Sequence, residues 1–153
     1  MREESRQIGE HRYTVTMLPL AQWQDLRDAV WPTLMGLTPD IVDSGGDPGE
    51  DQYRDLIRSV SVLLPLQPDS YRAALRLLQT CAKVDGQQGY LSSVGEVWWA
   101  QQGYAELSEW VAFSLEVQLV PFLRGLPLAS LHRLSKVRQS QSRSTSIGTS
   151  GGS

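Results

Sequence analysis

The chain is short of the residue types from which most active sites are built. Its 153 residues include one cysteine and two histidines, His11 and His132. A single cysteine excludes an internal disulfide framework and favours a reducing compartment such as a cytoplasm. Neither histidine has a cysteine or a carboxylate at metal-ligand spacing, so both are interpreted as surface residues. Cys81 lies on the apolar face of an expected helix, which favours a small core residue over a nucleophile.

Motifs for phosphate, calcium or acyl-transfer chemistry are also missing. Gly45-Gly46 has no Lys-Ser or Lys-Thr after it, and no Gly-x-Ser-x-Gly sequence occurs. The densest acidic run lacks the alternation, central glycine and closing glutamate of a calcium loop; it comprises Asp40, Asp43, Asp47, Glu50, Asp51 and Asp55. We therefore expect a protein that is not an enzyme and that uses no metal and no cofactor.

Long hydrophobic runs are absent as well. No apolar stretch approaches the roughly 20 residues that span a bilayer, and the charged segment 1–6 does not resemble a signal peptide. Hydrophobic residues nevertheless make up 41% of the chain, enough for one core. We expect one soluble intracellular domain over residues 1–136, followed over residues 137–153 by a disordered tail rich in Ser, Arg and Gly.

Charge is unevenly distributed along the chain. No acid follows Glu116, whereas five bases do. Residues 1–123 hold nine bases and seventeen acids, a net charge of −8. An acidic body with a basic tail can pair internally, with another copy or with an acidic partner. The tail bases have no interleaved aromatic residues, which is a weak footprint for nucleic acid.

Periodicity predicts a mainly α fold with a small N-terminal β-hairpin (α+β), built as a bundle of four to five helices. Gly9-Glu10 suits a type II′ turn in a hairpin over residues 6–18, with Tyr13, Val15 and Met17 on one face. A first helix is expected over residues 20–34, with Pro32 interrupting its last turn.

The middle of the chain contains two further helices. A loop is expected over residues 41–50, followed by helices over residues 50–64 and 69–80. Asp69 is expected to cap the second of these, which carries Arg72 and Arg76 one turn apart on its flank. Residues 82–94 are interpreted either as a second short β element or as a loop.

The longest helix is expected between residues 97 and 120, with a possible break at Gly103. One apolar stripe comprises Tyr104, Leu107, Val111 and Leu115, and a second comprises Trp110, Phe113, Val117 and Val120. Such a helix is either buried between two layers, or buries one face and offers the other to a partner. Both interpretations stay open on the sequence alone.

Aromatic residues supply the candidate binding site. Five Trp against two Phe is an unusual ratio, and Trp is enriched among the residues that dominate protein interfaces. The adjacent Trp98 and Trp99 point about 100° apart on a helix, so one can lie in the core and the other at a rim. The predicted partner-binding residues are Trp98, Trp99, Tyr104, Trp110, Phe113, Val117 and Val120.

The order of these parts resembles that of the tail assembly chaperones of tailed bacteriophages. That family begins with a strand pair around a Gly turn, then Leu-Pro and a helix, as in Ile8-Gly9-Glu10-His11-Arg12-Tyr13-Thr14-Val15 and Leu18-Pro19-Leu20 here. Its later motifs resemble Val84-Asp85-Gly86, Gly103-Tyr104-Ala105-Glu106-Leu107, Leu115-Glu116-Val117-Gln118-Leu119 and Phe122-Leu123. The resemblance covers residues 8–123. Gln118 replaces the usual Asn, and Leu119 the usual Phe.

The resemblance implies a non-catalytic role in virion assembly in the host cytoplasm. Such chaperones bind and solubilise the tape measure protein before the tail tube polymerises, and some also exist as a longer product of ribosomal frameshifting. The implied partners are amphipathic helices of the tape measure protein and further copies of the chain, with no membrane. The alternatives are a structural tail or connector component of the virion, and a regulatory protein that binds nucleic acid through its basic tail.

Overall fold

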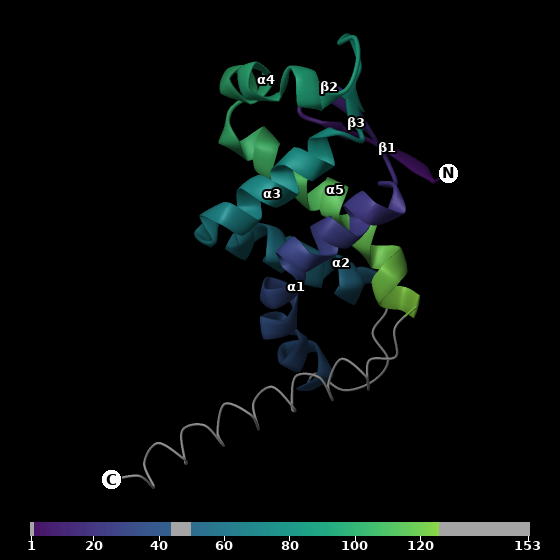
Figure 1. Ribbon diagram of the computed structural model, residues 1–153, viewed down its shortest axis with the longest axis vertical. Coiled ribbons are helices and arrows are strands. Elements are labelled where there is room, and N and C mark those ends of the chain that lie inside the picture. The colour runs from purple at the N-terminus through teal and green to yellow at the C-terminus, as the bar shows by residue number, and fades with distance from the viewer. Residues whose placement is uncertain (1, 44–49, 126–153) are drawn as a thin grey trace, which may run out of the picture.

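The computed structural model describes residues 2–43 and 50–125, which form a small sheet at one end of a group of helices (Figure 1). The main-chain elements in order are β1 (Glu3–Ile8), β2 (His11–Thr16), α1 (Leu20–Asp43), α2 (Glu50–Leu63), η1 (Leu64–Leu66), α3 (Pro68–Gln79), β3 (Ala82–Val84), η2 (Leu91–Ser93), α4 (Gly95–Gln102) and α5 (Tyr104–Gly125). The expected class, mainly α with a small N-terminal β part, is confirmed. The tail predicted over residues 137–153 lies outside the described residues.

The N-terminal hairpin has the predicted turn. β1 and β2 are antiparallel, with Ile8 opposite His11 at the turn. Gly9 has φ +61°, and no residue other than glycine has positive φ in the described part of the chain. A positive φ at the first central position followed by a negative one defines a type II′ turn. The alternation also holds, because Tyr13 and Val15 are both completely buried.

A third strand completes the sheet. β3 pairs antiparallel with β2, so that Val84 lies opposite Tyr13 and Ala82 opposite Val15. The sheet order is β1-β2-β3. Of the two interpretations of residues 82–94, the β element is therefore correct for its first three residues. It joins the N-terminal hairpin, which local sequence cannot show because the two segments are almost 70 residues apart.

Helix α1 is longer than the sequence predicted. It continues through Pro32 to Asp43, where an end near Leu34 and a loop from Ile41 were expected. Pro32 is exposed, so its ring meets solvent and the helix loses essentially one hydrogen bond. Thr33, Leu34 and Met35 are buried directly after it. Burial of this turn against α2 and α3 outweighs the local cost of the proline.

Helices α2 and α3 begin and end close to the predicted positions. The start of α3 differs in one detail, because Pro68 occupies its first turn and Gln67 is the N-cap residue. Asp69 therefore lies inside the helix, and its predicted capping role is wrong. A carboxylate in the first turn still interacts favourably with the helix dipole.

The long C-terminal helix divides at Gly103, as its sequence suggested. Gly103 has φ +92° and separates α4 from α5. Helix α5 then runs through the centre of the fold and packs most extensively against α2, with β1, β2, α3 and α4 on its other sides. Every residue from Trp110 to Val120 is buried. Of the two interpretations of this helix, burial between layers is the one observed.

Candidate protein-binding groove

Six of the seven predicted partner-binding residues lie in the core. Trp110 and Phe113 are at most 1% exposed, and Trp98, Trp99, Val117 and Val120 are also buried. Tyr104 alone is accessible, with 86% of its surface exposed. The folded chain therefore presents no docking surface made of these seven residues. The tryptophans have a structural role instead.

That role is an aromatic cluster beneath the sheet. The ring of Tyr13 stacks on Trp99 at 5.9 Å between centroids, and Trp99 lies 5.1 Å from Trp110. Trp98 donates its indole N–H to the Tyr13 hydroxyl at 2.9 Å, and Trp99 donates to Oε1 of Gln79 at 3.2 Å. Both adjacent tryptophans are therefore held in place, because one binds the hairpin and the other binds α3.

Tyr13 continues this network to the start of α5. Its hydroxyl donates to Glu106 Oε2 at 2.9 Å, and the same oxygen lies 3.4 Å from Nδ1 of His11. Burial is the main cause that raises the pKa of Tyr13 above its usual value, and Glu106 adds to it. A tyrosine that stays protonated donates a permanent hydrogen bond. These residues fix the hairpin to α5.

Gln118 is a second link, between α5 and the end of the hairpin, and it was not among the predicted core or site residues. Its side chain is completely buried. Oε1 accepts a hydrogen bond from the backbone N–H of Leu18 at 3.0 Å, and Nε2 donates to the carbonyl oxygen of Thr16 at 2.8 Å. The amide thus pairs with main-chain groups where β2 ends. A polar residue inside a long apolar helix is the signal that could have predicted such a contact.

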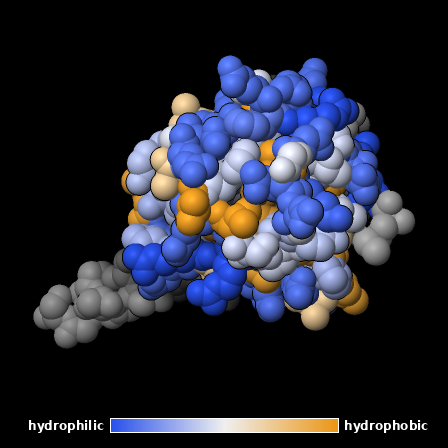
Figure 2. All heavy atoms as spheres, turned by 90° about the horizontal axis from the view of Figure 1, so that it is seen from above, coloured by the Kyte–Doolittle hydropathy of each residue, from blue (hydrophilic) through white to orange (hydrophobic). Residues whose placement is uncertain are grey.

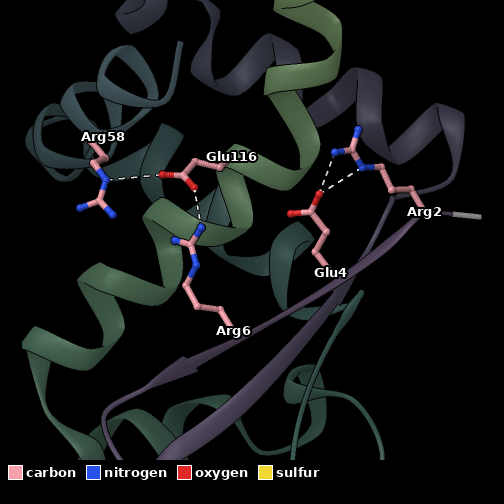
Figure 3. Close-up of polar contacts among 5 residues, drawn as sticks. All are labelled: Arg2, Glu4, Arg6, Arg58 and Glu116. Atoms are coloured by element: carbon pink, nitrogen blue, oxygen red, sulfur yellow. Dashed lines mark hydrogen bonds and ion pairs between the residues drawn. The ribbon is translucent and has the colours of Figure 1, made fainter. Parts of the chain in front are cut away.

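Glu116 forms the third link. Figure 3 shows its carboxylate between the guanidinium groups of Arg6 and Arg58, which come from β1 and α2. The nitrogen–oxygen distances are 3.1 Å to Arg6 and 3.5 Å to Arg58. Glu116 is buried at the floor of a charged groove of about 530 Å³. The two arginines therefore compensate the charge of the carboxylate, which in turn links β1 and α2 to α5.

The residues that the sequence weighed for metal binding and nucleophilic chemistry can be located in part. The described residues contain no group of three His, Cys, Asp or Glu side chains that could hold a metal ion. Cys81 is buried, and burial raises the pKa of its thiol to about 11, which keeps it in the unreactive protonated form. His132 lies outside the described residues. Within the described ranges, no helix is both long and apolar enough to cross a membrane.

One accessible groove with apolar residues in its lining lies between α3 and α4. It has a volume of about 520 Å³. Leu75 and the half-buried Val94 line it, together with Val97, which is 66% exposed. Arg72, Arg76, Gln79, Ser92, Ser93, Gly95 and Glu96 complete its lining. We name this feature the α3–α4 groove.

Tyr104 extends the apolar surface beyond this groove. It lies close enough to Tyr71 of α3 to contribute to the raised pKa of that residue, for which burial is the larger cause. Tyr71 precedes Leu75 by one helical turn and therefore shares its face of α3. Tyr71 and Leu75 thus share one face of α3, and Tyr104 lies near Tyr71.

The groove is small beside the rest of the surface. Figure 2 shows the face of the molecule that lies at the top of Figure 1. On this face, apolar side chains form separate small areas surrounded by polar ones. The other strongly exposed apolar side chains include Leu20, Val62 and Leu66. Val62 and Leu66 lie at the corner between α2 and α3, away from the groove lining.

Comparison with known proteins adds no relative to this description. No family, no curated protein and no solved structure matches the chain. The candidate site is therefore described by its own geometry, a groove between α3 and α4 that combines apolar and cationic side chains.

Proposed function

We propose that this chain is a non-catalytic tail assembly chaperone that binds and solubilises a tape measure protein before tail tube polymerisation. The observation that carries the proposal is the α3–α4 groove, with the exposed Val97 in its lining and the exposed Tyr104 near the same face of α3. Val97 and Tyr104 are 66% and 86% exposed beside it. Large apolar side chains next to a groove are typical of surfaces that receive the apolar face of a helix.

This proposal places the contact on a different surface from the one that periodicity suggested. The second stripe of α5 was expected to face a partner, but it is enclosed by the chain itself. Of the predicted partner-binding residues, Tyr104 is the one that is accessible. Binding at the α3–α4 groove leaves the core intact, so it is compatible with release of the partner when tube subunits assemble.

The test is co-expression with a tape measure protein, a long protein built of amphipathic helices. The wild-type chain should raise the soluble fraction of that protein several-fold. Val97→Asp and Tyr104→Ser should each abolish most of this gain, because they remove apolar surface at the groove and its rim. The soluble fraction is measured by centrifugation and quantitative gel analysis.

Matched controls lie elsewhere on the surface. Val62 is 72% exposed and Tyr90 is 45% exposed, and neither lines the groove. Val62→Asp and Tyr90→Ser should leave the soluble fraction unchanged. A wild-type chain that gives no gain in solubility would refute the proposed function. Equal losses in the groove and control variants would refute the groove as its site.

A further inference from the structure

Two arginines in the α3–α4 groove have no carboxylate partner among the residues that the structure describes. In the part of the chain that the structure describes, Arg2, Arg6, Arg27 and Arg58 each form an ion pair. Arg72 and Arg76 form none within residues 2–43 and 50–125, although both line the groove. Two like charges one helical turn apart weaken a helix slightly. Arg76 lies in the last turn of α3 and interacts favourably with the helix dipole, but Arg72 has no such role.

The spacing of the pair matches one turn of a helix. Side chains four residues apart on α3 have Cβ atoms about 5–6 Å apart, and any helical ligand repeats its own side chains at the same interval. A guanidinium prefers a carboxylate, which it can bind through two parallel hydrogen bonds. The wall formed by α3 therefore complements two acids one turn apart.

The remainder of the groove restricts the ligand further. Leu75, Val94 and Val97 add apolar side chains to the lining and favour a ligand with an apolar stripe. Glu96 lies in the same lining and complements a basic side chain. This combination disfavours nucleic acid, because a phosphate backbone carries no apolar stripe and would meet a carboxylate.

We propose that the α3–α4 groove recognises an amphipathic helix whose apolar stripe is flanked, on the side of α3, by two acidic residues one turn apart. This inference deepens the proposed function and depends on it, since it specifies which tape measure segments the chain would select. Helices with the same stripe flanked by lysine are rejected, because both lysines would face the arginines.

Two synthetic helical peptides test the proposal. Both carry leucine at positions i, i+3, i+4 and i+7, and they differ only in having Glu or Lys at two flanking positions one turn apart. Fluorescence anisotropy with the full chain should show that the Glu peptide binds about tenfold more tightly than the Lys peptide. The Glu peptide forms two exposed ion pairs with the arginines, whereas the Lys peptide is repelled by both. The preference should shrink in 0.5 M NaCl.

Charge reversal identifies the arginines. The double variant Arg72→Glu with Arg76→Glu should reverse the preference, so that the Lys peptide binds more tightly. Arg76→Glu alone is compared with Arg12→Glu, which changes an exposed arginine on β2 by the same charge. Arg76→Glu should weaken binding of the Glu peptide several-fold, and Arg12→Glu should not.

Four results would overturn the inference. The first three are equal binding of the two peptides, a preference for the Glu peptide that survives in the double variant, and a loss of that preference in Arg12→Glu as large as the loss in Arg76→Glu. Loss of binding to a random-sequence DNA duplex in the double variant, without a change in peptide binding, would also overturn it. Co-expression separates the two proposals. If Val97→Asp prevents solubilisation and the arginine variants do not, the charge inference fails while the proposed function stands.

Discussion

Helix α5 and the α3–α4 groove show that apolar sequence and accessible apolar surface are different properties. From Trp110 to Val120, α5 is enclosed on every side although its sequence offers two apolar stripes. Helices α3 and α4 are less apolar, yet they leave Val97 and part of Leu75 uncovered. A helix with surplus apolar surface attracts a second layer from its own chain, whereas a modest strip at a helix junction can stay open.

The largest difference in stability between the two regions is expected when an acidic residue is placed in α5. Trp110→Asp and Phe113→Asp should each lower the free energy of unfolding by more than about 4 kcal/mol, since both lose a large buried ring and bury a charge. Circular dichroism should show an unfolded or molten chain at 25 °C. Tyr104→Asp, on the same helix but exposed, should remain folded. A well-folded Phe113→Asp chain that fails only in partner binding would contradict the enclosed helix.

The next largest effect is expected at Gln118. Gln118→Leu should destabilise the chain by about 3 kcal/mol, because the N–H of Leu18 and the carbonyl of Thr16 both lose their partner. Urea titration followed by tryptophan fluorescence measures this change. Gln101→Leu, at an exposed position of α4, should change stability by less than about 0.5 kcal/mol. Similar changes in the free energy of unfolding for both variants would show that Gln118 does not stabilise the core.

Alkaline pH should also act on the enclosed region. Burial raises the pKa of the Cys81 thiol from 9.0 to about 11. The folded state therefore favours the protonated thiol, so its contribution is complete below pH 9 and is lost as pH rises to 11. The loss approaches about 2.5 kcal/mol for two pKa units. Urea titrations at pH 8, 9.5 and 10.5 measure this loss. In Cys81→Ala, the free energy of unfolding should decline less between pH 9 and 10. This pH range is chosen because it lies below the range in which Tyr13 titrates.

A smaller loss is expected at Glu116, at the edge of the enclosed region. Glu116→Gln should cost about 1 kcal/mol, because Arg6 and Arg58 are partly exposed and regain water when the carboxylate is removed. Glu109 lines the same charged groove but is exposed, and Glu109→Gln should have no measurable effect. A cost equal to that at Gln118 would show that the two arginines are held more rigidly than their exposure indicates.

The groove itself should be almost neutral for stability. Val97→Asp and Arg72→Glu should each change the free energy of unfolding by less than about 0.5 kcal/mol, since both side chains are exposed. Thermal unfolding followed by circular dichroism checks this. A large destabilisation by Val97→Asp would mean that the groove is part of the core, and the contrast between the two regions would disappear.

The parts of the fold that depend on neighbouring residues could be predicted from sequence. Gly9 identified the hairpin turn, Gly103 the break between α4 and α5, and helical periodicity the buried faces of α2 and α3. The end of α1 was wrong, because packing after Pro32 overrides the local signal. The pairing of β3 with β2 depends on contacts far apart in the chain, which periodicity does not encode.

The candidate site was less predictable than the fold. The sequence predicted Trp98, Trp99 and Trp110 as partner-binding residues, and their burial was not foreseen. It could not show that Tyr13 and Gln79 would hydrogen-bond to Trp98 and Trp99 inside the fold. Arg72 and Arg76 were visible as a pair on one helix flank. Their significance depends on the groove beside them and on the absence of a carboxylate partner among the described residues, and both of these are properties of the tertiary structure.

The contact of Gln118 with Thr16 and Leu18 also determines when the chain can complete its fold during synthesis. The hairpin leaves the ribosome first, but the amide that closes its lower end follows about a hundred residues later. Until then the nascent hairpin lacks the central helix, and before residues 82–84 have been made it also lacks its third strand, so its apolar face stays open to water. The newly made chain is thus itself in need of protection from aggregation until α5 has emerged.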